Sequence, residues 1–375
     1  MHILQTIAGL NINNGGTSRT VPYLCEVLTE QGAKVSLLTI GSPDEVLSLP
    51  DEHKVNVRVV RPKTYADKRF QMAREFEVHL EHLIQTQRPD VIHDHGVWLW
   101  SNWLVSKIAH KHNIPLVNSP NGMLMPASLA HKSLLKRMSW MFYQRPVTQR
   151  ASALHVTSEV EGAYLSALGI HKPTWVIPNG IRLPDTMPTK RFIMPRKALF
   201  LSRLHPIKGI MLLLDAWQNI RSEGWVLEIA GPDEGGYAAE VLQKVTENNL
   251  TATVRVTGPV SDTEKWELLT QADLFVLPSK SENFGIVIGE AMAAGLPVIT
   301  TTGAPWPVLK TEKMGWWVAP TLPALAGALQ EGIGLSPEAR SLMGARARQY
   351  VTKRFAWDQI ASTFLDKYRS LRTCT

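Results

Sequence analysis

The sequence of 375 residues contains only two cysteines, Cys25 and Cys374, which lie near opposite ends of the chain. Two thiols so far apart offer neither a disulfide framework nor a cysteine-rich metal site. We therefore expect a protein of a reducing compartment, the cytoplasm. The N-terminus also lacks a basic segment followed by a long apolar run, so we interpret His2–Ile7 as a first strand rather than as part of a signal peptide.

Long apolar runs are also missing. The stretch from Ala291 to Leu309 carries no charge, but it contains Pro297, Pro305 and Pro307. Prolines at these positions exclude a membrane-spanning helix of about 20 residues. The sequence therefore predicts a protein that is soluble or bound at most to a membrane surface.

Acidic residues are absent from residues 95–158, which contain seven lysines and arginines. That excess equals the formal net charge of the whole chain, +7, and the 33 basic residues elsewhere match the 33 acidic residues. Because the excess is local, it indicates a positively charged face or site rather than a surface that binds nucleic acid.

Short apolar runs alternate with helical patterns along the chain, which predicts an α/β fold with parallel sheets in both halves. The expected strands cover residues 2–7, 35–39, 55–60, 91–93, 116–119, 153–157, 198–201, 225–230, 253–257, 274–277 and 298–301. The length favours two domains, and a proline-rich stretch at 173–195 marks the boundary between them. The final segment has Trp357, Ile360, Phe364 and Tyr368 on one helical face.

Gly15 and Gly16 follow the first expected strand and precede an apolar helical pattern. Glycines let the backbone approach a ligand closely, and a helix N-terminus attracts phosphate. The loop has neither the Gly-x-Gly-x-x-Gly spacing nor a Walker motif. A plain tight turn is an equal alternative.

Arg203 and Lys208 lie between an expected strand and the helix that follows it. Two cations at such a junction can bind a diphosphate from two sides and neutralise the charge that builds as it leaves. The alternative is a solvated loop with one surface salt bridge. We interpret His205, between the two cations, as a residue that shapes the loop.

Glu282 and Glu290 lie eight residues apart, one before and one within a helix expected to end at Gly295. They can therefore address different parts of one extended ligand. The backbone N–H groups of residues 283–286 would line the helix N-terminus and suit anionic or hydroxyl-rich ligands. A capped amphipathic helix is the alternative, but it leaves Glu290 unexplained among small apolar residues.

Together these motifs resemble the retaining nucleotide-sugar glycosyltransferases of family 4. The matching features span nearly the whole chain: Gly15-Gly16, Val176-Ile-Pro-Asn179-Gly180, Arg203-x4-Lys208, Gly231-Pro-Asp233, Gly258-Pro-Val and Glu282-x7-Glu290. Further motifs resemble the bacterial branch that builds lipopolysaccharide O-antigens and capsules: Val91-Ile-His93-Asp94-His95-Gly96, Ser119-Pro-Asn121-Gly-Met123-Leu, Gly303-Ala-Pro305-Trp306 and Gly315-Trp-Trp317.

The resemblance implies a GT-B fold, in which two Rossmann-like domains face a central cleft. Residues 1–185 would bind the acceptor and residues 186–355 the nucleotide-sugar donor. The C-terminal helix, within residues 356–375, would cross back to the N-terminal domain.

The resemblance also implies roles for individual residues. The donor would be held by Gly15, Gly16, Arg203, Lys208, Glu282, Asn283, Phe284, Gly285, Ile286 and Glu290. Of these, Arg203, Lys208 and Glu282 would be catalytic. Both cations would stabilise the departing nucleoside diphosphate, Glu282 would hold hydroxyls of the donor sugar, and Glu290 would accept hydrogen bonds from the ribose.

The expected reaction transfers a hexose from a UDP- or GDP-sugar to a hydroxyl of a lipid-linked glycan acceptor in the synthesis of bacterial lipopolysaccharide or O-antigen. Front-face substitution, which the family implies, requires no side-chain nucleophile. The chain has no Asp-x-Asp sequence, a common site for Mg²⁺ or Mn²⁺. We expect catalysis without a metal or a cofactor. The alternatives are a nucleotide-sugar epimerase of the same fold and a non-catalytic protein that binds carbohydrate or a lipid surface.

Two N-terminal residues are further candidates. His95 follows an expected strand, and we expect it to contact the acceptor or a phosphate, with structural packing as the alternative. His93 is expected to be structural. Asn121 follows the next expected strand, where many relatives carry His or Arg. Its amide would face the donor sugar, to which it can hydrogen-bond without a charge.

A helix expected over residues 132–145 has leucine, methionine and phenylalanine side chains on one face. The residues expected to contact an anionic membrane are Lys132, Lys136, Arg137, Trp140 and Tyr143. Cations beside aromatic rings suit the headgroup region, where a lipid-linked acceptor would be presented. We therefore expect a peripheral protein on the cytoplasmic face of the inner membrane. A solvated helix face is the alternative.

Overall fold

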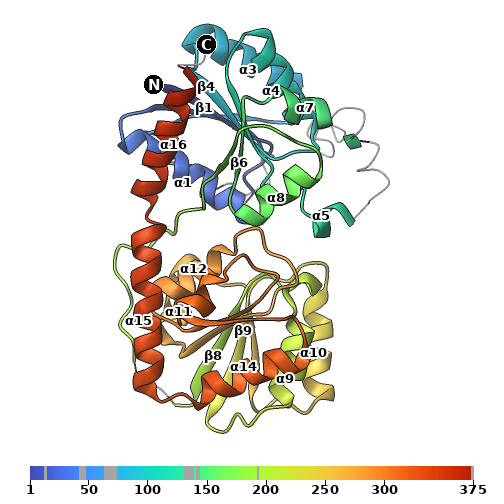
Figure 1. Ribbon diagram of the computed structural model, residues 1–375, viewed down its shortest axis with the longest axis vertical. Coiled ribbons are helices and arrows are strands. Elements are labelled where there is room, and N and C mark those ends of the chain that lie inside the picture. Colours follow the sequence, from blue (N-terminus) through green and yellow to red (C-terminus); the bar gives the residue numbers. More distant parts are fainter. Residues whose placement is uncertain are drawn as a thin grey trace. The chain divides into compact units, whose positions relative to one another are not determined.

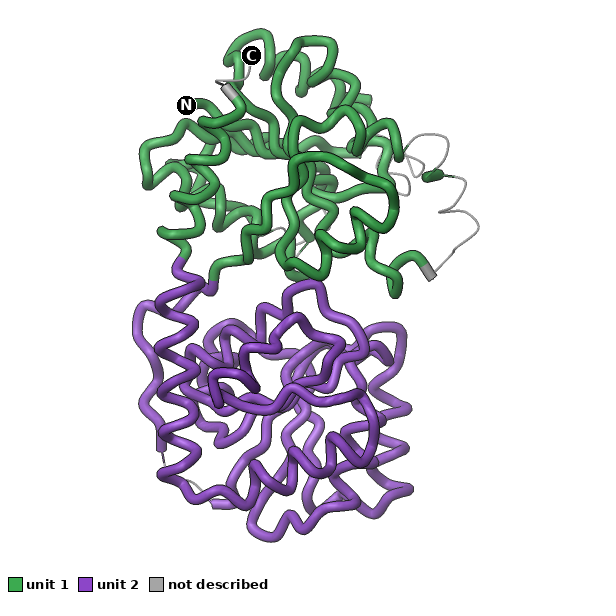
Figure 2. The backbone as a smooth tube through the Cα atoms, viewed as in Figure 1, with its two compact units in different colours: residues 1–180, 357–375 green, residues 181–356 purple. Residues whose placement is uncertain are grey.

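A computed structural model describes residues 1–11, 15–41, 48–62, 74–130, 139–140, 144–191 and 194–372. The chain divides into two compact units (Figure 2). The N-terminal unit comprises residues 1–180 and 357–375, and the C-terminal unit comprises residues 181–356. The division between Gly180 and Ile181 precedes the expected boundary at 185, and the chain returns to the N-terminal unit at Trp357.

In its described residues, the N-terminal unit contains a parallel sheet with the strand order β3-β2-β1-β4-β5-β6-β7. The strands are β1 (His2–Ile7), β2 (Lys34–Ile40), β3 (Asn56–Val60), β4 (Val91–His95), β5 (Leu116–Ser119), β6 (Ala153–Val156) and β7 (Thr174–Val176). β7 was not predicted, because its three residues, Thr-Trp-Val, form no apolar run and lie at the edge of the sheet.

The described helices of this unit are α1 (Thr17–Glu30), α3 (Arg74–Gln87), α4 (Trp100–Lys111), α5 (Pro126–Ala130), α7 (Arg145–Arg150), α8 (Glu159–Ala167) and α16 (Trp357–Arg372). The C-terminal helix α16 packs beside α1 (Figure 1). The predicted apolar face of α16 is confirmed, because Trp357, Ile360, Phe364 and Tyr368 are all buried in the core of this unit.

The C-terminal unit contains a second parallel sheet, whose described strands follow the order β10-β9-β8-β11-β12-β13. The strands are β8 (Arg196–Leu201), β9 (Trp225–Ala230), β10 (Val254–Gly258), β11 (Leu274–Leu277), β12 (Val298–Thr301) and β13 (Gly315–Val318). The predicted α/β class with two parallel sheets is therefore confirmed. β13 was missed: its sequence, Gly-Trp-Trp-Val, begins with glycine, and this strand lies at the edge of the sheet, where its residues are only partly buried.

The described helices of the C-terminal unit are α9 (Ile210–Gln218), α10 (Tyr237–Glu247), α11 (Asp262–Gln271), α12 (Ile286–Ala293), α13 (Val308–Thr311), α14 (Leu322–Gly334) and α15 (Pro337–Arg354). Helices flank the sheet on both sides in Figure 1, with α9 packed on α14 and α12 packed on α15. Among the helices in the described part of the whole chain, none combines the length and the apolar character needed to cross a membrane.

Candidate functional site in the C-terminal unit

The loops that carry the predicted donor residues meet at one edge of the C-terminal sheet. Parallel strands have their carboxyl ends at the same edge, which is where ligands of such folds bind. Arg203 follows β8, Glu234 follows β9, Glu282 follows β11 and Trp306 follows β12. The sheet topology therefore brings together residues that lie far apart in the sequence.

A short 3₁₀ helix over Pro206–Lys208 shapes the junction between β8 and α9. His205 caps this turn, because its Nδ1 accepts a hydrogen bond of 3.1 Å from the Ile207 N–H. At Gly209, φ is +75°, and a Cβ atom there would lie 2.1 Å from the carbonyl oxygen of Pro278. Only glycine allows this approach, which brings the start of α9 against the end of β11.

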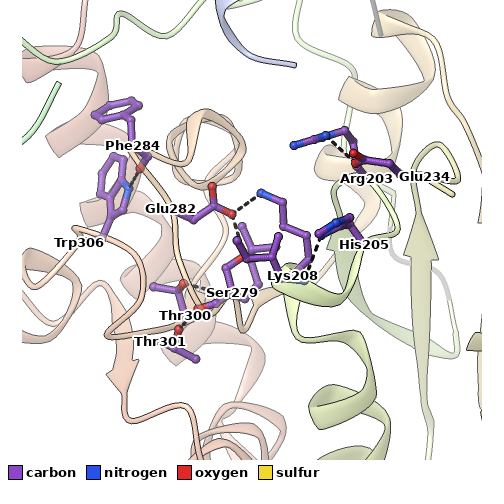
Figure 3. Close-up of polar contacts among 12 residues, drawn as sticks. Arg203, His205, Lys208, Glu234, Ser279, Glu282, Phe284, Thr300, Thr301 and Trp306 are labelled. Atoms are coloured by element: carbon purple, nitrogen blue, oxygen red, sulfur yellow. Dashed lines mark hydrogen bonds and ion pairs between the residues drawn. The ribbon is translucent and has the colours of Figure 1, made fainter. Parts of the chain in front are cut away.

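Two of the three predicted catalytic residues, Lys208 and Glu282, are in direct contact (Figure 3). Lys208 Nζ donates to Glu282 Oε1 over 2.6 Å, and Ser279 Oγ donates to the same oxygen over 2.7 Å. Only 11% of each charged side chain is exposed. The carboxylate is therefore held in one orientation beside a cation that is itself largely shielded from water.

Arg203 is paired with a different carboxylate, that of Glu234. The distance from Arg203 Nη1 to Glu234 Oε2 is 2.5 Å, and both side chains are more than two-fifths exposed. Glu234 reaches Arg203 because Leu204 forms a β-bridge with Asp233 in the loop after β9. Arg203 and Lys208 thus come from one junction but turn to separate acidic partners (Figure 3).

The loop before α12 is fixed by several hydrogen bonds. The Glu282 N–H donates to the Gly303 carbonyl over 2.8 Å. The Trp306 indole N–H donates to the Phe284 carbonyl, and the two rings lie 5.3 Å apart. Gly285 caps α12 with a φ of +80°, so Ile286 begins the helix. The predicted placement of one carboxylate on the loop and one within the helix is confirmed.

The side chain of Asn283 has a hydrogen-bond acceptor that a ligand could use. Its Oδ1 atom is buried and receives no hydrogen bond from any described residue. A buried acceptor without a donor costs free energy, so a ligand hydroxyl at this position would stabilise the site.

Glu290 lies within α12, and Lys265 of α11 donates to its Oε1 atom over 2.7 Å. Sequence reasoning missed Lys265, and it also missed Ser279 and Glu234. The Ser261-x-x-Glu264 capping box does indicate the start of α11. Nothing in that pattern shows that Lys265 reaches a carboxylate in another helix.

Candidate residues in the N-terminal unit

Gly15 and Gly16 form the turn between β1 and α1. Gly15 has a φ of +94°, and its carbonyl accepts a hydrogen bond of 2.7 Å from Ser18 Oγ. The Gly16 carbonyl begins the helix by accepting from the N–H groups of Arg19 and Thr20. The turn therefore leads directly into a helix N-terminus, as expected for a phosphate-binding loop and equally for a plain turn.

His95 is only 5% exposed and stacks on His93, with the ring centroids 4.2 Å apart. Burial, together with the nearby His155, lowers the pKa of His95 to about 3. Its Nε2 lies 2.8 Å from Gln5 Oε1. His95 is therefore a neutral hydrogen-bonding group at physiological pH, and any contact with a phosphate would be made without a charge.

His93 is fully buried, and burial holds its pKa well below the usual value. Its ring nitrogens lie 2.6 Å from the Tyr368 hydroxyl and 2.6 Å from Ser119 Oγ. This ring connects the sheet to α16, as expected for a residue with a structural role.

Asn121 has a φ of +52° and donates from Nδ2 to the Ser119 carbonyl over 3.0 Å. The next N–H, that of Gly122, donates over 2.5 Å to the buried carboxylate of Glu161 in α8. Glu161 also accepts from the Thr157 N–H over 3.0 Å. This carboxylate, which the sequence patterns did not reveal, fixes the loop that carries Asn121.

Of the residues expected to contact a membrane, Lys132, Lys136, Arg137 and Tyr143 lie outside the described part of the chain. Trp140 is described, and its contact with a membrane stays a prediction. Its ring is half-buried against an apolar cluster, 6.2 Å from the ring of Trp98. A helical wheel shows the faces of one segment but not the distant side chains that pack against them.

Comparison with known proteins

The fold and the site define an α/β protein with two parallel-sheet units, one of which gathers paired cations and carboxylates at its ligand-binding edge. Sequence models of two domain families match this chain. The glycosyl transferase 4-like domain matches residues 15–180, and the glycosyl transferases group 1 domain matches residues 188–350. The chain therefore belongs to the group 1, family 4-like glycosyltransferases, which have the GT-B fold.

Several known proteins resemble the chain over most of its length. A D-inositol 3-phosphate glycosyltransferase of Jonesia denitrificans is 26% identical, over 96% of this chain and 92% of that protein. A GDP-mannose:cellobiosyl-diphosphopolyprenol alpha-mannosyltransferase of Xanthomonas campestris is 27% identical, over 75% of this chain and 74% of that protein. A sucrose-phosphate synthase structure from Thermosynechococcus elongatus superposes with a TM-score of 0.81 over all of both chains, at 23% identity.

Proposed function

We propose that this glycosyltransferase transfers a hexose, with retention, from a UDP- or GDP-sugar to a hydroxyl of a lipid-linked glycan in the synthesis of bacterial lipopolysaccharide or O-antigen. The observation that carries the proposal is the pairing of Lys208 with Glu282 beside Arg203 at the carboxyl edge of the C-terminal sheet. The acceptor class is supported by the Xanthomonas relative, whose name includes a diphosphopolyprenol-linked sugar.

The two cations would act on the donor diphosphate. A bound diphosphate would compete with Glu234 for Arg203 and with Glu282 for Lys208, because all four groups are charged and within hydrogen-bonding distance of their partners. As the bond from the anomeric carbon to the phosphate oxygen breaks, negative charge grows on that oxygen. Oriented cations at this position stabilise the charge.

The acceptor hydroxyl would attack the anomeric carbon from the face that the diphosphate leaves. Its proton would pass to the departing phosphate oxygen, so that one C–O bond forms, one breaks and no side-chain nucleophile takes part. Glu282 and the unpaired Asn283 Oδ1 would accept hydrogen bonds from donor-sugar hydroxyls. Arg203 and Lys208 would supply the charge compensation that a divalent cation supplies in other transferases.

The acid-free stretch at 95–158 would bind an anionic membrane or a pyrophosphate-bearing acceptor on the cytoplasmic side. Replacing Lys132, Lys136 and Arg137 by glutamine should release the protein from phosphatidylglycerol liposomes if the membrane is the partner. Unchanged binding to such liposomes would leave the acceptor pyrophosphate as the target of this charge.

A thermal-shift screen of UDP, GDP and their hexose conjugates tests the proposed function. The correct donor should raise the unfolding temperature, since it binds only the folded state. Incubation of that donor with a lipid-linked acceptor should then yield a glycoside with the anomeric configuration of the donor. An inverted product would refute retention, and an epimerised sugar formed without any acceptor would favour an epimerase.

A further inference from the structure

The ion pair between Lys265 and Glu290 joins two neighbouring helices of the C-terminal unit. Lys265 Nζ, from α11, lies 2.7 Å from Glu290 Oε1, from α12. Both side chains are 12% exposed. This pair is therefore largely removed from water, unlike the exposed Arg203–Glu234 pair.

Lys265 neutralises a carboxylate that is largely buried. The neighbours of Glu290 in α12, from Ile288 to Ala293, are all buried. A carboxylate among such residues requires a compensating charge, and removal of one partner of a buried pair is strongly unfavourable. Among the described residues, Lys265 is the cation that provides this compensating charge.

Lys265 is also held in place by its own surroundings. Its Nζ atom lies 3.3 Å from Asp262 Oδ1, one helical turn earlier in α11. The same atom lies 5.6 Å from the centre of the Trp266 ring. The neighbouring carboxylate and aromatic ring restrict the position of the ammonium group. From this position it can orient Glu290.

The hydrogen bond from Lys265 occupies one carboxylate oxygen of Glu290, namely Oε1. A carboxylate has two oxygens and about four acceptor sites, so Oε2 remains able to accept. No other hydrogen bond reaches the Glu290 side chain from the described residues. The geometry thus leaves one oriented oxygen for a ligand that donates hydrogen bonds.

We propose that Lys265 is a positioning residue that orients Glu290 toward the ribose hydroxyls of the donor nucleotide and thereby makes the site selective for ribonucleotides. The inference rests on the proposed function, in which Glu290 binds the ribose. A site built to bind a hydroxyl disfavours the analogue that lacks it, because the buried acceptor is then left unpaired.

The test compares the Kd of the preferred nucleoside diphosphate, UDP or GDP, with that of its 2′,3′-dideoxy analogue, by calorimetry. For the wild-type protein, the Kd of the ribonucleotide should be lower than that of the dideoxy analogue by about tenfold or more, as expected for hydrogen bonds to a charged group. Lys265→Met should abolish this preference by weakening ribonucleotide binding, while binding of the dideoxy analogue stays unchanged. That unchanged binding also shows that the variant is folded.

Four further variants complete the experiment. Lys265→Arg should restore most of the preference, because it retains a cation at this position. Glu290→Ala should abolish the preference, and adding Lys265→Met to it should cause no further loss, since both act through one interaction. Lys244→Met, which breaks the Lys244–Asp215 ion pair between α10 and α9, is the matched control and should leave both Kd values unchanged.

Two results would overturn the inference. Equal weakening of both ligands by Lys265→Met would indicate a purely structural role, and a preserved preference would show that Lys265 does not act on Glu290. If neither UDP nor GDP binds the wild-type protein, the proposed function fails together with this inference. Binding of a diphosphate that depends on Arg203 but not on Lys265 would refute the inference alone.

Discussion

Lys208 Nζ lies 2.6 Å from Glu282 Oε1, so two residues expected to bind different parts of the donor are bonded to each other. The pair keeps both side chains in place before a donor arrives. A diphosphate that approaches Lys208 therefore meets a cation that is already oriented but shared with a carboxylate. This relationship pre-organises the edge of the C-terminal sheet at which we propose that the donor binds. Pre-organised charged groups stabilise a transition state effectively.

Lys208→Met should lower kcat/KM by roughly two orders of magnitude, because an oriented charge donor contributes about 3 kcal/mol to transition-state stabilisation. The measurement is the rate of nucleoside diphosphate release with the preferred donor and acceptor. Lys310→Met, at an exposed lysine of α13, is the control and should retain the wild-type rate. A fall of less than about threefold for Lys208→Met would contradict a catalytic role for this residue.

Glu234→Gln should tighten the binding of the nucleoside diphosphate by up to about fivefold. The exposed pair that Glu234 forms with Arg203 is worth about 0.2–1 kcal/mol, and a bound phosphate must compete with it. Calorimetric titration measures the effect, with Glu240→Gln, at an exposed position of α10, as the control. Weaker binding by Glu234→Gln would show that Glu234 assists the ligand instead of competing with it.

Transfer should continue at the wild-type rate in an excess of EDTA. The reason is that Arg203 and Lys208 would provide the positive charge that stabilises the leaving diphosphate. The assay is product formation after passage of protein and substrates over a chelating resin, with and without added Mg²⁺. Loss of activity that Mg²⁺ restores would refute catalysis without a metal.

Stability should fall on acidification from pH 7 to pH 5. Burial lowers the pKa of His95 to about 3 and that of His155 to about 4, so both are neutral in the folded protein, whereas an unfolded histidine with a pKa of 6.5 gains a proton. Each therefore removes about 2 kcal/mol from the free energy of unfolding at pH 5. Asp94 acts in the opposite direction by about 1 kcal/mol, because burial raises its folded pKa to about 6.

In His155→Gln, the free energy of unfolding should accordingly fall by about 2 kcal/mol less between pH 7 and pH 5 than in the wild-type protein. Urea unfolding followed by tryptophan fluorescence at pH 7, 6 and 5 measures the change. His110→Gln, at an exposed position of α4, should leave the wild-type slope. An unaltered slope in His155→Gln would show that this buried imidazole does not drive the acid sensitivity.

Gly180→Ala should destabilise the N-terminal unit by about 1–3 kcal/mol, the usual cost of overpacking. An added Cβ would lie 2.3 Å from a ring carbon of Trp357 at the start of α16. Gly162→Ala in α8 is a matched control, because its nearest neighbour would be 3.7 Å away, and alanine is favoured over glycine within a helix. Equal stabilities of the two variants would mean that Trp357 moves aside without cost.

Local patterns were sufficient to predict much of the fold. Short apolar runs identified β1, β5, β9, β11 and β12 with their correct bounds, and a helical apolar pattern identified the buried face of α16. They failed for β7 and β13, which are short strands at the edges of their sheets and are not fully buried, unlike the equally short inner strands β5, β11 and β12. They could not show that the Trp140 ring lies near Trp98, because a helical wheel contains only one segment of the chain.

The sequence by itself determined the α/β class and the order of the motifs. It also placed Arg203, Lys208 and Glu282 before helices and Glu290 within one, because these positions follow from neighbours along the chain. Only the tertiary structure decided which charges meet. Lys208 and Glu282 are 74 residues apart in sequence, and Lys265 and Glu290 are 25 apart. Their contacts arise because parallel strands place their carboxyl ends at one edge of a sheet, and because adjacent helices bury side chains against each other, which no local pattern of residues encodes.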